Sequence, residues 1–164
     1  MIPDAGRERD VRDRLMQSQA CYRLGDRVMT NVDSEGLSRT VFRAAEPQLF
    51  VANLEASFAF YTRRLGFAVA FSYGEPPFYG QVFRGGARLN LRCVESGVVN
   101  QEVRARDTLL AASITVDDAA PLFLEYQAAD VDFVQMLREE PWGARTFIVR
   151  DPDGNFILFA GQGD

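Results

Sequence analysis

The side chains of this chain that could do chemistry are carboxylates, arginines, hydroxyls and two cysteines, because the sequence contains no histidine. Histidine is the commonest metal ligand and the usual general base, so its absence narrows both kinds of site. A base would have to be a carboxylate such as Glu46, Asp107 or Glu140, and a nucleophile could be Cys93, Ser113 or a tyrosine. None of these nucleophiles stands at a recognisable spacing from a base. The sequence therefore predicts no catalytic residue.

The two cysteines favour a reducing compartment. Cys21 and Cys93 lie far apart and have no metal-ligand spacing, so free or buried thiols are expected rather than a disulfide. Cys93 alternates with Leu89 and Leu91, which predicts a thiol that faces the core.

The bulk composition excludes several classes of partner. A length of 164 residues suits one domain or two small packed halves. The net charge of −5 argues against binding to nucleic acid or to anionic membranes. The first ten residues have mixed charge and no apolar core, and no apolar run approaches membrane-spanning length. We therefore expect a cytoplasmic protein.

The elements that must position these groups begin with a strand at residues 48–51. Asn53 then suits a helix N-cap, and Gly66 suits the residue just beyond the end of that helix. Between them an apolar stripe at helical spacing is expected to bury one side of the helix: Leu54, Phe58, Tyr61 and Leu65. Further strands are predicted at residues 67–73, 78–83 and 87–94, with a break at Pro76-Pro77 and a turn at Gly85-Gly86.

The second half of the chain repeats the first. Three apolar positions recur after the same interval of 65 residues: Val51 as Val116, Phe58 as Phe123, and Tyr61 as Tyr126. The predicted fold is α+β, with two βαβββ modules that form a curved mixed sheet around a cavity. Module one spans residues 45–94 and module two 109–162, joined by the polar connector 95–108, so that the whole domain covers residues 45–162.

Residues 1–44 form an N-terminal extension with a predicted charged helix at 7–23 and possible short strands at 28–30 and 40–42. Two interpretations stay open. The segment is a family-specific extension, or it is an arm that covers a groove or reaches a second subunit.

The last hairpin carries a resemblance. Trp142-Gly143, then Phe147 to Asn155 (FIVRDPDGN), precede a short apolar strand at residues 156–159, with Phe156 and Leu158 on one face and Ile157 and Phe159 on the other. Together with residues 49–61 and Leu65-Gly66-Phe67, this pattern resembles the glyoxalase/bleomycin-resistance/extradiol-dioxygenase superfamily, also called the vicinal oxygen chelate proteins. The resemblance covers about residues 45–162.

Metal-dependent members of that superfamily place four ligands, usually histidine and glutamate, on four strands. Laying that pattern on this chain puts the four positions at Glu46, Asn90, Ala111 and Leu158. Two oxygen donors beside alanine and leucine make a poor transition-metal site. The resemblance therefore implies a chain without a catalytic metal or another cofactor, closest in type to the bleomycin-resistance proteins.

Those proteins hold an antibiotic in clefts between two subunits, which implies a homodimer and a small-molecule ligand. On the strand at residues 87–94, Arg88, Asn90 and Arg92 are expected opposite the helix-packing face. Aromatic residues near the Pro-rich breaks suggest a rim on which flat ligands could stack, with Phe78 and Phe147 assigned instead to the core. The predicted ligand-binding residues are Glu46, Gln48, Phe50, Arg88, Asn90, Arg92, Trp142, Phe156 and Leu158.

The leading functional hypothesis is metal-independent binding and sequestration of an aromatic, antibiotic-like molecule, as expected of a drug-binding antibiotic-resistance protein. One alternative is an enzyme of the same fold (lyase, isomerase or oxygenase) that uses carboxylates or a metal carried by its substrate. A second is a regulatory or partner-binding module. The arginines suit a cationic drug poorly, which points to a different aromatic natural product.

Overall fold

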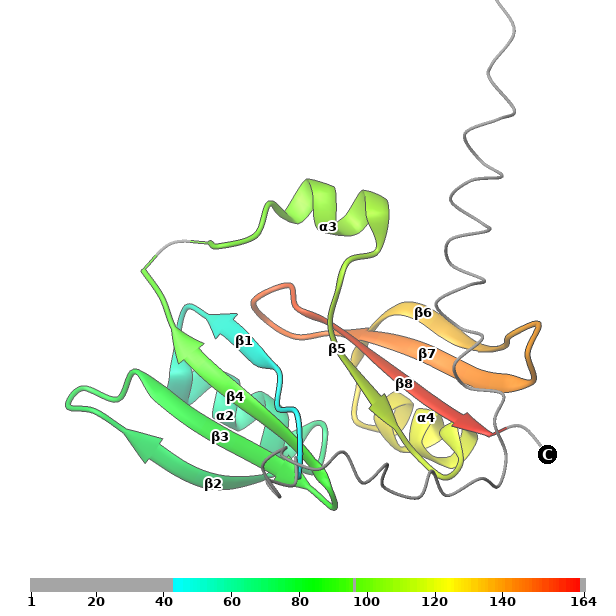
Figure 1. Ribbon diagram of the computed structural model, residues 1–164, viewed down its shortest axis with the longest axis horizontal. Helices are drawn as coiled ribbons and strands as arrows, with labels where there is room; N and C mark the ends of the chain where they lie inside the picture. Colours follow the sequence, from blue (N-terminus) through cyan, green and yellow to red (C-terminus); the bar gives the residue numbers. More distant parts are fainter. Residues whose placement is uncertain (1–42, 96, 163–164) are drawn as a thin grey trace, which may run out of the picture. The chain divides into compact units, whose positions relative to one another are not determined.

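The computed structural model describes residues 43–95 and 97–162, and the elements expected within residues 1–42 lie outside them. The first module contains one helix and four strands (Figure 1). In chain order they are β1 (Gln48–Val51), α2 (Leu54–Arg63), β2 (Ala68–Tyr73), β3 (Tyr79–Arg84) and β4 (Ala87–Cys93).

The second module has the same order of elements after a short connecting helix. Its elements are α3 (Gln101–Asp107), β5 (Leu110–Thr115), α4 (Ala119–Ala128), β6 (Asp132–Glu139), β7 (Ala144–Arg150) and β8 (Phe156–Gln162). The sheet orders correspond, β1-β4-β3-β2 and β5-β8-β7-β6, and in each sheet the first pair is parallel and the rest antiparallel. The predicted α+β fold of two βαβββ modules is confirmed, as two four-stranded sheets that do not close on one another.

Local sequence explains where the helices begin and end. The Asn53 side chain accepts a hydrogen bond from the Ala56 backbone N–H and so caps α2, as predicted. Gly66 follows α2 with φ of +68°, a conformation that favours glycine. Asp118 caps α4 in the same way, through the Ala120 N–H.

Each sheet packs one face against its helix, and the opposite face is called its open face here, although Ile148 and Phe156 on that face of the second sheet are buried. In the first sheet, Leu49, Val51, Leu89 and Leu91 are buried on the helix side. In the second sheet, Phe147, Ile157 and Phe159 hold the equivalent positions, and both sets belong to a single buried cluster. Because side chains alternate along a strand, the intervening residues lie on the open faces. The open faces are therefore where this fold can present a site.

The structure differs from the predicted elements at two places. A bulge between Val69 and Phe71 shifts the register of β2, so Val69 pairs with the core residue Val82 and Phe71 pairs with Gln81. The connector 95–108 contains α3, which holds the buried Arg104 against Gly154 O and Asn155 Oδ1. Within the described residues, no helix combines the length and apolar character needed to cross a membrane.

The hairpin between β7 and β8 ties the two modules together. The Tyr61 hydroxyl of α2 donates to Asp151 Oδ2 over 2.8 Å, and the Ala52 N–H donates to Asp153 Oδ1 over 2.7 Å. Asn155 Nδ2 donates to the carbonyl of Phe50 over 3.0 Å. The motif that carries the resemblance therefore has a structural task, which is to join module two to the first strand and helix of module one.

Candidate functional site

Six of the predicted binding residues gather on or beside the open face of the first sheet. The parallel register sets Gln48 beside Asn90 and Phe50 beside Arg92. On the other side of β4, the antiparallel register gives these three β4 residues cross-strand partners on β3: Arg92 pairs with Tyr79, Asn90 with Gln81, and Arg88 with Phe83. The predicted orientation of Arg88, Asn90 and Arg92, opposite to Leu89 and Leu91, agrees with this register.

A polar network forms the centre of this face. Gln81 Nε2 donates to Glu46 Oε2 over 2.8 Å and to Asn90 Oδ1 over 3.0 Å. Gln81 Oε1 accepts from an Arg88 guanidinium nitrogen over 3.0 Å, and Arg88 Nε lies 3.8 Å from Glu46 Oε1. Gln81 is only 7% exposed, so its amide is held in one orientation by three partners.

This network decides how the metal-ligand positions fit an ion. Glu46 and Asn90 have the oxygen donors expected there, but both accept hydrogen bonds from the same Gln81 amide. Ala111 and Leu158 have no donor atom. In the described part of the chain, no three His, Cys, Asp or Glu side chains cluster in a way that could hold a cation. The donor chemistry of these four positions does not fit a divalent ion.

Aromatic rings surround the network. Phe71 and Tyr79 lie with ring centroids 5.8 Å apart, and Tyr73 and Phe78 form an edge-to-face pair at 5.6 Å. Phe78 is 39% exposed and lies under the Arg92 guanidinium at 4.5 Å, so its assignment to the core was wrong. Its position in the break before β3 keeps it away from α2. Phe147 is fully buried, as predicted.

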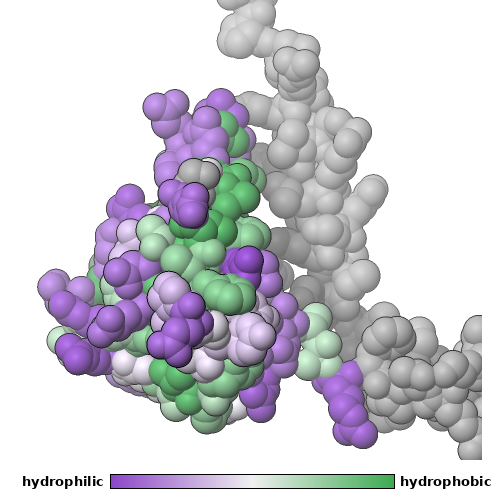
Figure 2. Space-filling model, turned by 90° about the vertical axis from the view of Figure 1, so that its left-hand side faces the viewer, coloured by the Kyte–Doolittle hydropathy of each residue, from purple (hydrophilic) through white to green (hydrophobic). Residues whose placement is uncertain are grey.

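The surface of the first module has both apolar and hydrophilic side chains. Figure 2, which views the first module's side, shows apolar patches between hydrophilic side chains. Phe71 and Tyr73 are 42% and 66% exposed, an unusual state for large apolar side chains in a sheet. The face therefore combines accessible rings, two arginines and a polar centre with satisfied hydrogen bonds.

The other predicted residues belong to the second sheet. Phe156 and Leu158 lie on its open face, opposite to Ile157 and Phe159 as predicted, but Phe156 is 3% exposed. Trp142 lies in the β6–β7 turn and is 50% exposed. No contact described in the structure joins these three side chains to the Gln81 network.

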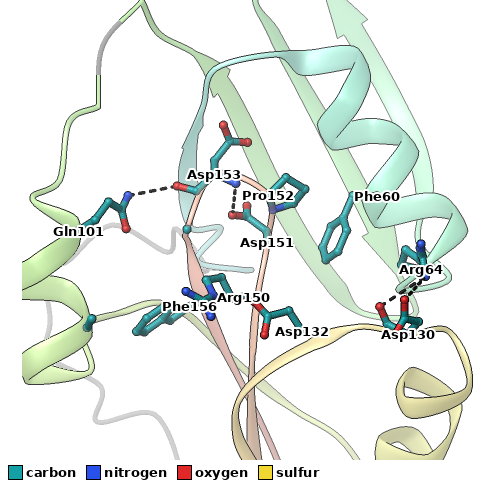
Figure 3. Close-up of a pocket in the computed structure, with 12 residues that line it drawn as sticks. Phe60, Arg64, Gln101, Asp130, Asp132, Arg150, Asp151, Pro152, Asp153 and Phe156 are labelled. Atoms are coloured by element: carbon teal, nitrogen blue, oxygen red, sulfur yellow. Dashed lines mark hydrogen bonds and ion pairs between the residues drawn. The ribbon is translucent and has the colours of Figure 1, made fainter.

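A pocket of about 720 Å³ lies beside the last hairpin, between α2, α3 and the start of β6 (Figure 3). Its charges already have partners: Arg150 Nε donates to Asp132 over 2.7 Å, and Arg64 donates to the Ala129 carbonyl. Asp151, on its wall, accepts from Tyr61, from the Asp153 N–H, and from Asn155 twice. The open face differs in having accessible rings and, among the described residues, an Arg92 guanidinium with no carboxylate within ion-pair distance, which makes it the better candidate for ligand recognition.

Burial raises the pKa of both titratable groups in the contact between Tyr61 and Asp151. Desolvation raises the pKa of Asp151, although hydrogen bonds from Asn155 and Tyr61 oppose the change. Desolvation and the neighbouring Asp151 carboxylate raise the pKa of the Tyr61 hydroxyl.

A second cavity of about 790 Å³ lies between residues 84–89 and 113–118, and Arg88 contributes to its wall.

The sequence analysis missed Gln81, although a signal for it was present. A tight turn at Gly85-Gly86 pairs Arg84 with Ala87, and this register carries Gln81 opposite Asn90 three pairs earlier.

Cys93 is a half-buried free thiol whose Sγ lies 3.3 Å from the Ala52 carbonyl, on the side of Leu89 and Leu91.

Comparison with known proteins adds to this geometry. The model of the Glyoxalase/Bleomycin resistance protein/Dioxygenase superfamily matches residues 40–159. The chain is similar to the bleomycin-binding protein of bleomycin-producing Streptomyces verticillus, crystallised with copper(II)-bleomycin, at 29% identity over 76% of this chain and 99% of that one, with a TM-score of 0.59. No match to the chain was found among curated protein sequences.

Two further solved structures share the fold. UcmS2 is 21% identical over 74% of this chain and 98% of its own, with a TM-score of 0.60. A lactoylglutathione lyase from Agrobacterium tumefaciens is 20% identical over 73% of this chain and 92% of its own, with a TM-score of 0.55. A bleomycin-binding protein and a lactoylglutathione lyase therefore share this fold, and the fold alone does not distinguish binding from catalysis.

Proposed function

The chain belongs to the glyoxalase/bleomycin resistance protein/dioxygenase superfamily, and from that premise we propose that it binds and sequesters a small aromatic molecule without transforming it. The observation that carries the proposal is the open face of the first sheet, where accessible rings surround a polar centre with its hydrogen bonds satisfied. Such a face can hold a flat ligand by stacking and orient it with a few polar groups.

The chemistry of the centre supports binding over catalysis. Lyases and dioxygenases that use a metal as a Lewis acid need open donor positions, and Glu46 and Asn90 both accept from Gln81. The similarity to a bleomycin-binding protein at 29% identity points the same way. The alternative is an enzyme of this fold that works through carboxylates or a substrate-borne metal.

The proposed assembly is a homodimer that acts in the cytoplasm, with residues 45–162 as the ligand-binding domain. The open face of the first sheet leaves Phe71 and Tyr73 accessible, and Trp142 is exposed in a turn of the second module. A second copy that covers these faces would turn two open sheets into closed clefts. In that arrangement Leu158 and Trp142 would complete a site begun by Arg88, Asn90 and Arg92 of the other copy, with the buried Phe156 packed beneath them.

Native mass spectrometry of the protein purified from its own host tests both parts of the proposal. We expect a dimer with one small organic molecule per site, recovered unchanged after denaturation. Metal analysis and turnover of the methylglyoxal–glutathione adduct form the second arm. A stoichiometric zinc, nickel or iron, with turnover lost on chelation, would replace sequestration by the enzyme alternative.

A further inference from the structure

The charges on the open face of the first sheet are unequal. Three charged side chains belong to it, Glu46, Arg88 and Arg92. Glu46 accepts from Gln81 and lies 3.8 Å from Arg88, so its charge is already opposed inside the network. These three side chains give the face a net charge of +1.

Arg92 carries that extra charge. Its guanidinium lies over the Phe78 ring at 4.5 Å, and among the described residues no carboxylate lies within ion-pair distance of it. A stacked guanidinium presents its N–H groups at its edge, in a fork that matches the two oxygens of a carboxylate or similar acid. Arg88, by contrast, is bonded to Gln81 and lies over Phe83 at 5.8 Å.

The aromatic strip begins next to this guanidinium. Tyr79 is the cross-strand partner of Arg92, and Tyr73 is the partner of Tyr79 on the next strand. Phe71 lies against Tyr79, and Phe78 lies against both Tyr73 and Arg92. A ring system laid on this strip would bring an attached acidic group to the N–H edge of Arg92.

We propose that the ligand of this face is a planar aromatic acid, held by Arg92 through its anionic group and by Phe71, Tyr73, Phe78 and Tyr79 through its rings. The inference rests on the proposed small-molecule binding and names the chemical class of its ligand. A cationic aromatic ligand would meet Arg88 and Arg92 as like charges, and a neutral one would leave Arg92 without a charged partner.

Three matched probes test the charge rule with the full chain at constant ionic strength: 2-naphthoate, 2-naphthamide and 2-naphthylmethylammonium, titrated calorimetrically. We expect naphthoate to bind about tenfold or more tightly than naphthamide, because hydrogen bonds to charged groups are the stronger class, and the ammonium to bind most weakly. Arg92→Gln should bring the affinities for naphthoate and naphthamide to within about twofold of each other. Arg63→Gln, at an exposed position in the last turn of α2, makes the same charge change and should preserve the preference.

The outcomes separate this inference from the proposed function. Equal affinities for the three probes, tighter binding of the ammonium, or a preference that survives Arg92→Gln would overturn the acid rule while aromatic binding stands. Failure of all three probes to bind would remove the aromatic-face proposal together with the acid rule. Circular dichroism of Arg92→Gln, with an unchanged spectrum and melting temperature, separates loss of recognition from loss of fold.

Discussion

The contact between Tyr61 and Asp151 gives the sharpest test of how the modules are joined, through the substitution Tyr61→Phe. The change removes one hydroxyl from a fully buried ring and leaves the ring's packing intact. That hydroxyl donates over 2.8 Å to a buried carboxylate that keeps three other donor contacts. Hydrogen bonds to charged groups contribute about 1.5–3 kcal/mol. We therefore expect a loss of about 2 kcal/mol, or about 4–8 °C in melting temperature for a chain of this size.

Tyr126→Phe is the matched control. Tyr126 is also fully buried, but its hydroxyl donates over 3.2 Å to the neutral Leu65 carbonyl. Its loss should cost about 0.5–1.5 kcal/mol, the range for a neutral pair. Urea unfolding followed by circular dichroism measures both variants, with m-values expected to stay equal. If Tyr61→Phe costs no more than Tyr126→Phe, the ionised Asp151 acceptor is not what makes this contact strong.

The pH dependence of the same pair follows from the raised pKa of Asp151. A carboxyl whose folded pKa lies above its ordinary value of 3.8 contributes stability that is fully present below that value and is lost as pH rises through the folded pKa. Removing the Tyr61 hydroxyl takes away a donor that favours the ionised form. The difference in unfolding free energy between the wild type and Tyr61→Phe should therefore shrink as pH falls from 7 toward 4. A constant difference would contradict the assignment.

Three further predictions concern other parts of the fold. Gln81→Leu removes both donor bonds to Glu46 and Asn90 and should cost about 1–2 kcal/mol in urea unfolding, because water can replace only part of the network; an unchanged midpoint would contradict this. Gly161→Ala would place a Cβ 2.5 Å from the Ala119 backbone nitrogen and should cost about 1–3 kcal/mol, whereas Gly86→Ala meets open space and should cost little; equal melting temperatures would refute the steric argument. Incubation with EDTA should leave both the melting temperature and the ligand affinity unchanged, and a clear fall in either would show a structural or binding metal.

Features set by local sequence could be predicted, and those set by pairing could not. The Asn53 cap, the turn at Gly66 and the alternation of Phe156 with Ile157 depend on residues a few positions apart, so the chain alone indicates them. The repeat after 65 residues then supplied the second module. The core assignment of Phe78 was wrong because the predicted strand began at residue 78, whereas β3 begins one residue later, at Tyr79, and leaves Phe78 exposed in the break.

Helix α3 in the connector 95–108 was not predicted from the sequence. Residues 101–107 look polar, and a charged segment of this length predicts a solvated linker. Yet α3 is held because Arg104 reaches Gly154 O and Asn155 Oδ1 in the hairpin, 50 and 51 residues further along the chain. Asn100 caps the helix by accepting from two backbone N–H groups. The Asn100 cap is a local signal for a helix start, but the contacts that hold α3 in place depend on partners too distant in sequence to be predicted from it.

The Gln81 side chain affects both the binding of a metal ion and the binding of a ligand on the open face. Its Nε2 protons are directed at Glu46 and Asn90, so an ion at that point would have to displace two hydrogen bonds and would meet the Arg88 guanidinium 3.8 Å from Glu46. Arg88 opposes the charge of Glu46, and among the described residues Arg92 has no carboxylate within ion-pair distance. The Gln81 amide therefore makes the centre unsuited to a divalent cation, and the proposed preference of the face for an anion rests on Arg92. A cationic ligand at this point would have to break the hydrogen bonds of Gln81 to Glu46 and Asn90, so its binding should become stronger in Gln81→Leu.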